Sequence, residues 1–350
     1  MNIKIGKYIV GKNHPCFIVA EMSGNHNQSL SRAIKIIKAA KRAGANAIKL
    51  QTYSADTITL KCKKKDFTIS KSSPWKKSKF MWNLYNNAST PWAWHKKLFS
   101  EAKKNNLEIF SSPFDESAVD LLEKLNCVAY KIASPEINHF PLLKRVAKTK
   151  KPVILSTGLS DFKDLRVAVN FLKKNGTKKI IILKCITSYP AKIGELNLKT
   201  IQDISQKFKC ISGFSDHTKG FIAPLTAAIL GASVIEKHFT LNDNKKTVDS
   251  FFSFKEKDFS EMVKNIRASE RSIGETNYDI SKDSKKSYTA RRSIYFSRKI
   301  KKGEKITIDN IKVVRPAFSL SPKHYYKILG MRTKRNFNIG DRINLKDLHK

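Results

Sequence analysis

The most constraining feature of the sequence is a repeated alternation of short apolar runs with longer amphipathic stretches. The first run is CFIVAE at 16–21, and the last amphipathic stretch spans 257–273. The runs have the length of buried strands, and apolar residues recur at helical spacing in the stretches between them. Eight such pairs in about 270 residues match the size and strand count of a (β/α)8, or TIM, barrel.

The boundaries of the runs assign the expected elements. Strands are expected at 16–21, 46–51, 107–112, 127–134, 152–158, 179–185, 211–214 and 232–235. Helices are expected at 30–43, 94–105, 116–124, 142–148, 161–174, 198–208, 218–231 and 257–273, with a polar insert after 51. Strands joined by helices in this way are parallel, so their carboxyl ends open on one face, where barrel enzymes carry their active sites.

Two histidines stand at the ends of the last two strands. His217 follows the run 211–214 and His238 follows 232–235, so both are expected to face the same space. A converging pair of imidazoles can hold a divalent ion of the manganese, iron or zinc type and leave positions open for a substrate. A single histidine after a strand is more often a structural residue, so the pairing is what favours a metal site.

Other reactive side chains follow the remaining strands at the same end. They are Glu21, Lys49, Gln51, Ser112, Lys131, Ser134, Ser156 and Tyr189. Polar residues follow strands in any protein, so part of this set is consistent with ordinary turns. Lys49 and Lys131 differ, because each stands inside an apolar run and a buried lysine requires an anionic partner. The sequence therefore predicts a bound anion at this face.

The composition narrows the classes of partner and the compartment. The 68 Lys and Arg residues outnumber the 29 Asp and Glu residues, which gives a net charge of +39. These basic residues are spread along the chain and not gathered in one arm, so we expect no nucleic-acid partner, although an anionic substrate would benefit from the positive field.

Five cysteines without C-x-x-C spacing predict free thiols. No apolar run approaches 18 residues and no signal-peptide pattern is present, so we expect a cytoplasmic protein without a membrane partner.

The composition changes after the last expected helix. Residues 274–286 are polar and typical of a linker, and short strands are expected at 290–300, 301–307, 309–316 and 336–344. We therefore divide the chain into a barrel at 1–275, a linker at 276–287 and a small β-rich domain at 288–350. A unit of roughly 60 residues is marginal alone, so it is expected to lean on another surface.

The ordered motifs of the chain resemble those of the sialic acid synthase family. The matching barrel motifs are AEMSGNHNQS, AIKLQTY, SSPFD, YKIASPE, ILSTGLS, CITSYPA, GFSDHTKG and EKHFT. ARRSIYFSRKIKKGEKIT and VVRPAFSLSP resemble the family's C-terminal antifreeze-like (SAF) domain. Residues 73–95, which hold all four tryptophans, and 248–254 look most like the pseudaminic acid synthase branch. The resemblance implies a condensation of phosphoenolpyruvate with an amino sugar, here 2,4-diacetamido-2,4,6-trideoxy-L-altrose, with phosphate released by C–O cleavage.

The resemblance also implies roles at the phosphoenolpyruvate and metal sites. Lys49 and Lys131 would pair with the phosphate and carboxylate, with hydroxyl donors at Ser112, Ser134, Ser156 and Ser215. His217 and His238 would hold Mn²⁺, Mg²⁺ or Co²⁺ as a Lewis acid for the sugar aldehyde. Glu21 and Glu236 would be the acid and base groups, with interchangeable roles.

The sugar site and the quaternary structure are implied in the same way. Asp249 would bind a sugar hydroxyl. Arg315 would cover the sugar site of a neighbouring subunit in a domain-swapped homodimer. AFSLSP departs from the glycine-rich turn common in the family. A tryptophan-rich insert over the barrel suits a deoxy sugar with methyl and acetamido groups, but tryptophans that only pin the insert are an equally good interpretation.

Four alternative interpretations of the sequence remain open. Legionaminic and N-acetylneuraminic acid synthases share the core motifs, so the sugar is less certain than the reaction. A Schiff-base aldolase acting through Lys131 is a rival enzyme. A basic nucleic-acid-binding protein and an inactive binding scaffold are rivals of a different class.

Overall fold

The computed structural model describes residues 1–350, which form two compact units, Met1–Gly274 and Glu275–Lys350. In the first unit eight parallel strands close into a barrel in the order β10-β3-β4-β5-β6-β7-β8-β9. The strands are β3 (Phe17–Glu21), β4 (Ala47–Thr52), β5 (Glu108–Pro113), β6 (Tyr130–Ile132), β7 (Val153–Ser156), β8 (Ile180–Cys185), β9 (Ile211–Asp216) and β10 (Val234–His238). The predicted (β/α)8 fold is therefore confirmed.

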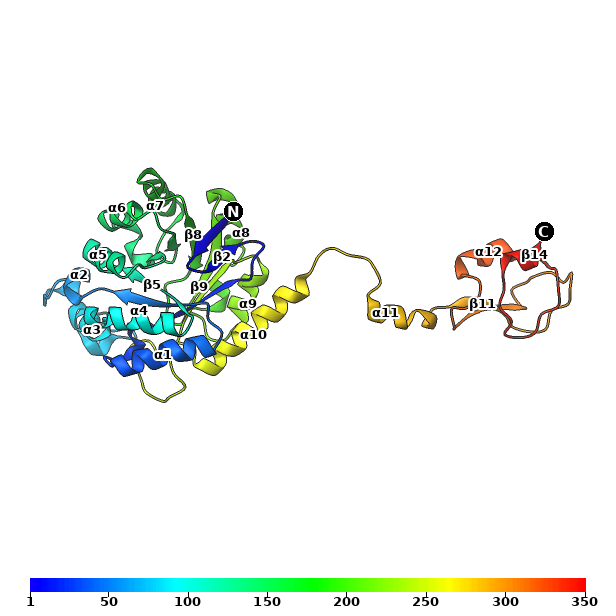
Figure 1. Ribbon diagram of the computed structural model, residues 1–350, viewed down its shortest axis with the longest axis horizontal. Coiled ribbons are helices and arrows are strands. Elements are labelled where there is room, and N and C mark those ends of the chain that lie inside the picture. Colours follow the sequence, from blue (N-terminus) through cyan, green and yellow to red (C-terminus); the bar gives the residue numbers. More distant parts are fainter. The chain divides into compact units, whose positions relative to one another are not determined.

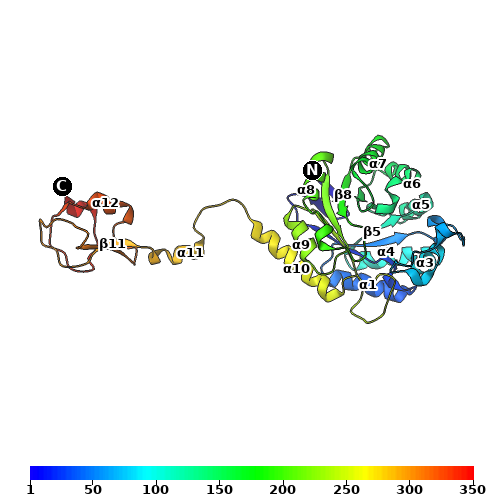
Figure 2. The ribbon, with the colours of Figure 1, turned by 180° about the vertical axis from the view of Figure 1, so that it is seen from behind.

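Eight helices alternate with these strands and surround the barrel, as Figure 1 and the reverse view in Figure 2 show. They are α1 (Leu30–Arg42), α4 (His95–Lys104), α5 (Glu116–Lys124), α6 (Phe140–Lys148), α7 (Phe162–Lys174), α8 (Thr200–Phe208), α9 (Ile222–Ile229) and α10 (Glu256–Ile273). Side-chain caps fix several starts: Ser29 accepts a hydrogen bond from the backbone N–H of Arg32, and Asp115 accepts one from that of Ala118. No helix of the structure is both long enough and apolar enough to cross a membrane.

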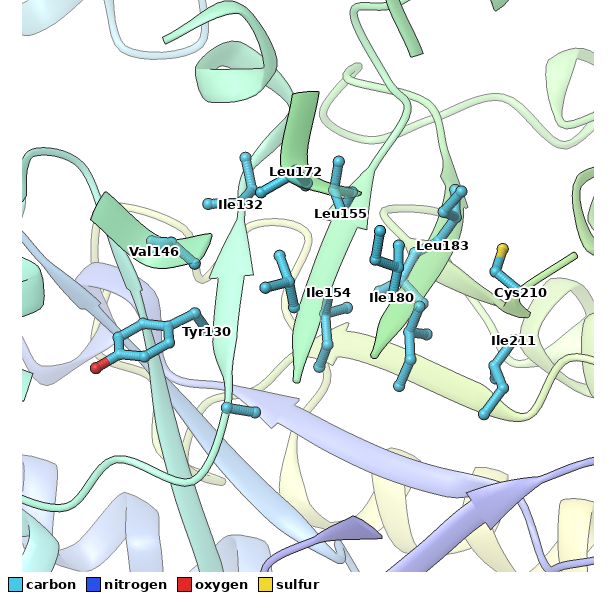
Figure 3. Packing of buried hydrophobic residues seen from close by; sticks show 14 of the residues in the cluster. Tyr130, Ile132, Val146, Ile154, Leu155, Leu172, Ile180, Leu183, Cys210 and Ile211 are labelled. Carbon is cyan, nitrogen blue, oxygen red and sulfur yellow. The ribbon is translucent and has the colours of Figure 1, made fainter. Parts of the chain in front are cut away.

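The core lies between the strands and the helix layer. Figure 3 shows Ile132, Leu155 and Leu183 on successive strands, with Val146 of α6 and Leu172 of α7 beside them. Because every strand is covered by helices outside and by side chains inside, the strands read as continuous apolar runs, which is why the sequence revealed them.

The N-terminal hairpin was missed by sequence reasoning, which began at Cys16. It consists of β1 (Asn2–Ile5) and β2 (Tyr8–Gly11), paired antiparallel. Its residues Ile3, Ile5 and Val10 are buried in the same cluster as Phe17, the first residue of β3. The hairpin therefore packs against the start of the barrel. Its strands have only four residues each, too few for a clear alternation signal.

Two element boundaries differ from prediction for physical reasons. The expected strand 127–134 shortens to β6, because the turn at Leu125 and Asn126 is followed by irregular backbone up to Ala129, and β6 shares only one residue pair with β5. The helix expected from 218 begins at Ile222. The carbonyl of Thr218 is instead taken by the Lys237 ammonium, at 2.7 Å.

The polar insert folds into short helices. They are α2 (Ala55–Ile58) and α3 (Met81–Ala88), with single 3₁₀ turns between them. Two buried histidines hydrogen-bond to residues at the ends of the insert: the His95 ring contacts Thr52 Oγ1 at 2.8 Å, and the His26 ring contacts Thr90 Oγ1 at 3.1 Å.

The second unit has its own small core. Its elements are α11 (Lys282–Lys286), β11 (Ser293–Phe296), β12 (Ile311–Val314), α12 (Tyr325–Ile328), β13 (Arg332–Thr333) and β14 (Leu348–His349). Ile294, Phe296, Ile311 and Phe337 are among its buried residues. The strands expected at 301–307 and 336–344 are wrong, since both regions form only isolated bridges. Hydrogen-bonded turns, such as the one from Asn338 to Asp341, interrupt them.

Candidate active site

Two glutamates and two lysines meet inside the carboxyl end of the barrel. Lys49 Nζ lies 3.0 Å from Glu21 Oε2 and 3.3 Å from Glu236 Oε1. Lys131 Nζ lies 3.1 Å from the same Glu236 oxygen. All four side chains are at most 5% exposed, and β6 and β10, which carry Lys131 and Glu236, are not neighbours in the barrel. These residues, the charged quartet below, therefore meet across the interior.

The quartet separates the two glutamates electrostatically. Burial alone would raise the pKa of Glu236, but Lys131 and Lys49 outweigh it and hold that pKa below its usual value. Burial raises the pKa of Glu21, although Lys49 opposes the rise. When environments push two carboxyl groups apart in this way, one is suited to stay ionised and the other to carry a proton. Glu21 is therefore the better proton carrier and Glu236 the better fixed anion.

Three other predicted residues hydrogen-bond to the quartet. Gln51 Nε2 donates to Glu21 Oε1 at 2.9 Å, and Ser215 Oγ donates to Glu236 Oε1 at 3.2 Å. Lys49 Nζ donates to Ser112 Oγ at 3.3 Å. The anion required by the two buried lysines is thus supplied in part by the protein's own carboxylates, which the sequence did not indicate.

A group of hydroxyls lies at the carboxyl ends of β6, β7 and β8. Ser134 Oγ accepts a hydrogen bond from the N–H of Gly158 at 2.9 Å. Ser156 Oγ and Thr187 Oγ1 are buried without any partner. A Cβ on Gly158 would come within 2.1 Å of Thr187 Oγ1, so only glycine fits there. Buried hydroxyls without partners are available to a ligand. Thr187 was not among the predicted residues, and its only signal was the CITSYP motif.

The two predicted histidines do converge. Their ring centroids are 5.4 Å apart. His217 Nδ1 lies 2.8 Å from the carbonyl oxygen of Ile186, which fixes that nitrogen as the donor and leaves Nε2 free. His238 Nδ1 is buried without a hydrogen-bond partner, and the nearest acid, Asp249, is 4.0 Å away. Burial, His217 and Lys49 lower the pKa of His238 well below its usual value, so its ring is neutral.

A metal ion would find an incomplete set of protein ligands at this pair. Nowhere do three or more His, Cys, Asp or Glu side chains gather as a metal site. His238 Nδ1, which has no partner, and His217 Nε2, left free because Nδ1 bonds to a backbone carbonyl, are nevertheless suitable donors for a divalent ion whose remaining positions are filled by water or substrate.

Aromatic rings cover the histidines. The Tyr189 ring lies 4.5 Å from that of His217 and 4.9 Å from that of Phe252, measured between centroids. Trp75 donates from Nε1 to the carbonyl of Val248 at 3.0 Å and packs 5.4 Å from Tyr189. The insert and the loop after β10 thereby meet above the site.

The other tryptophans lie elsewhere in the insert. Trp82 bonds to Asp56, and Trp94 packs against His26. Asp249, in the loop after β10, is buried and accepts a hydrogen bond from Ser23 Oγ.

One buried acid was missed, and one predicted residue belongs to the second unit. Burial raises the pKa of Glu136 to about 7, while Lys131 and Lys49 oppose the rise, and its Oε2 has no partner. Its only signal was the motif YKIASPE.

Arg315 lies in the second unit, exposed after β12, and is not among the residues brought together in the barrel.

A closed (β/α)8 barrel with buried acids, lysines and imidazoles at its carboxyl end has the arrangement of a barrel enzyme. The model of the NeuB family matches residues 36–278, and that of the SAF domain matches 291–349. The chain therefore belongs to the NeuB family, as the motifs predicted.

Individual relatives span the whole chain. The chain is 41% identical to the pseudaminic acid synthase of Campylobacter jejuni over 99% of both chains. It is also 41% identical to that of Helicobacter pylori, over 96% of this chain and 98% of the relative. The crystal structure of an N-acetylneuraminic acid synthetase from Leptospira borgpetersenii, in complex with citrate, superposes with a TM-score of 0.71 at 29% identity, covering 82% of this chain and 95% of that one.

Proposed function

We propose that the protein is a pseudaminic acid synthase. It condenses phosphoenolpyruvate with 2,4-diacetamido-2,4,6-trideoxy-L-altrose and yields pseudaminic acid and phosphate. The observation that carries this proposal is the charged quartet beside two converging imidazoles at the carboxyl end of the barrel. The 41% identity to two synthases of that name supports the choice of sugar.

Phosphoenolpyruvate would bind among the lysines and hydroxyls. Its phosphate and carboxylate require several cationic and donor groups, and Lys49 and Lys131 supply the cations. The hydroxyl donors would be Ser112, Ser134, Ser156 and Ser215. Ser156 supports this role because its hydroxyl is buried and has no partner in the protein.

A divalent ion, Mn²⁺, Mg²⁺ or Co²⁺, would be held by His217 and His238. When bound it supplies a Lewis acid for the aldehyde oxygen of the open-chain sugar. The protein's contribution is to leave His238 Nδ1 and His217 Nε2 without protein partners and to cover both rings with Tyr189 and Phe252.

The two glutamates would have different roles in the reaction. Carbon 3 of phosphoenolpyruvate attacks the aldehyde carbon, water adds at carbon 2, and the tetrahedral species collapses with loss of phosphate by C–O cleavage. Glu21, whose pKa is raised by burial, would exchange a proton with the water or the new alkoxide. Glu236 would remain ionised and hold both lysines in place.

The sugar would lie under the aromatic cover. Trp75, Tyr189 and Phe252 offer apolar faces to its methyl and acetamido groups, and Asp249 would accept from a hydroxyl. Arg315 from the SAF domain of a second copy would complete the site in a domain-swapped homodimer. We place the enzyme in the cytoplasm, where phosphoenolpyruvate is made.

Phosphate release from phosphoenolpyruvate with three sugars tests the proposal. The sugars are the diacetamido-trideoxy altrose, the corresponding mannose-type sugar and N-acetylmannosamine, each with Mn²⁺ and with a chelator. We expect the altrose to be fastest and the chelator to abolish turnover. Preference for either other sugar would assign a legionaminic or N-acetylneuraminic acid synthase instead. A covalent adduct trapped by borohydride at Lys131 would favour an aldolase.

A further inference from the structure

One more buried ion pair lies at the carboxyl end of the barrel, and the proposed reaction does not use it. Lys237 and Asp216 are each 1% exposed. The Lys237 ammonium donates to the Asp216 carboxylate and, at 2.7 Å, to the carbonyl of Thr218. It also lies 4.0 Å from the centre of the Phe254 ring. One ammonium thus contacts the end of β9, the loop that follows it and the loop that follows β10.

The strand register relates this pair to the two histidines. Asp216 and Lys237 are direct partners in the β9–β10 ladder. Side chains alternate along a strand, so Glu236 faces the interior while Lys237 faces the helix layer. His217 and His238 each follow the pair by one residue. The spacing of the two imidazoles therefore depends on the residue pair immediately before them.

The loops on both sides are tied to the same point. The backbone N–H of Phe254 bonds to the carbonyl of His238 at 2.8 Å, which connects the residue whose ring contacts Lys237 to the His238 backbone. Asp216 also accepts from the N–H of Thr218 at 2.8 Å, which bends the chain directly after His217. Both histidines are thus flanked by residues that contact the Lys237 ammonium.

Stability alone does not account for a charged pair at this position. A buried ion pair is often no more stabilising than well-packed apolar residues of the same volume, and its best-attested use is to fix one arrangement. Residues that fix the orientation of metal-binding histidines typically change metal affinity or activity by about 10- to 100-fold when they are replaced.

We propose that the Lys237–Asp216 pair is a positioning device that fixes the separation and orientation of His217 and His238. The pair does not touch substrate. This role rests on the metal site of the proposed function. Removing the pair should therefore loosen the imidazoles more than the phosphoenolpyruvate pocket, because the two lysines of that pocket, Lys49 and Lys131, lie on β4 and β6.

The affinity of the full chain for Mn²⁺ alone tests this role. It is measured from the electron paramagnetic resonance signal of the free ion. Asp216→Asn with Lys237→Met removes both charges, and we expect at least about 10-fold weaker Mn²⁺ binding. The KM for phosphoenolpyruvate should stay within about twofold, and excess Mn²⁺ should restore kcat. The matched control is Glu123→Gln with Lys151→Met, an ion pair of 2.6 Å at the amino end of the barrel, which should leave Mn²⁺ binding unchanged.

The outcomes separate the two proposals. Unchanged Mn²⁺ affinity in the folded double variant would overturn the role of the pair and leave the proposed function standing. A wild-type protein that neither binds Mn²⁺ nor releases phosphate would overturn the proposed function itself. If the double variant does not fold, Mn²⁺ binding to the single variant Asp216→Asn tests the role of the pair. Asparagine has the shape of aspartate, and its amide oxygen can still accept the hydrogen bond from the N–H of Thr218. Failure of that variant to fold would show that the pair holds the barrel together and would also overturn the positioning role.

Discussion

The two ends of the barrel bury different kinds of side chain: apolar ones at the amino end and charged ones at the carboxyl end. At the amino end, Ile3, Ile5 and Val10 of the hairpin pack against the start of β3. At the carboxyl end, each lysine ammonium of the quartet lies within 3.3 Å of a glutamate oxygen. Burying an isoleucine side chain stabilises a fold by about 1.5–3 kcal/mol, whereas buried ion pairs contribute little net stability. Stability and reactivity should therefore be separable by mutation.

Glu236→Gln should have the largest effect on activity. It removes the fixed negative charge that both Lys49 and Lys131 contact, so we expect kcat/KM to fall by about 100- to 1000-fold. Phosphate release measures the loss. Glu123→Gln, near the amino end, removes a carboxylate that pairs with Lys151 and should leave kcat/KM within about twofold. A Glu236→Gln enzyme with a tenth of wild-type activity would remove the quartet from the mechanism.

The carboxyl end also contains stabilising residues, which a pH series should reveal. Burial lowers the pKa of both His26 and His95 from 6.5 to about 4. Between these values the unfolded chain binds more protons than the folded one, so stability is complete above pH 6.5 and falls as the pH drops toward 4. Each histidine contributes at most about 3 kcal/mol to this loss.

A difference measurement isolates that contribution. Glu136, whose pKa is raised to about 7, acts in the opposite direction, because the folded state holds its proton more tightly. The free energy of unfolding in urea is measured for wild type and His95→Gln from pH 4 to 8, and the contribution of Glu136 cancels in the difference between them. The two curves of unfolding free energy against pH should converge as the pH falls. Parallel curves would mean that the neutral His95 ring, bonded to Thr52, adds no pH-dependent stability.

Ile5→Ala should lower stability and leave activity unchanged, whereas Glu236→Gln should lower activity. The Ile5 side chain is fully buried in the hairpin, so we expect a loss of about 3 kcal/mol in the free energy of unfolding. The value of kcat/KM should not change. Ile9→Ala in the same hairpin, where the side chain is 50% exposed, is the control and should cost less than about 1 kcal/mol. Equal costs for the two variants would show that the hairpin does not close the barrel.

The two ends also differ in how far the sequence revealed them. The strands and the convergence of His217 and His238 were predictable, because buried parallel strands read as apolar runs and their ends share one face. The hairpin was missed because its strands are too short to show a period. Glu136 and Thr187 were missed because burial, which gives them their importance, depends on packing between segments far apart in the sequence. The pairing of Lys49 with Glu21 and Glu236 was missed for the same reason.

Removing the second unit should give the smallest effect on the barrel's stability and a moderate one on its activity. The two core clusters of the barrel contain no residue beyond Ile266, and the second unit has a cluster of its own. A chain ending at Ser287 should therefore unfold at the wild-type temperature. If Arg315 of a second copy covers the sugar, kcat/KM for the sugar should fall by about 30-fold, or about 2 kcal/mol, with the KM for phosphoenolpyruvate unchanged. Arg315→Ala in the full chain should reproduce most of that loss, and a fully active truncated protein would confine the whole reaction to the barrel.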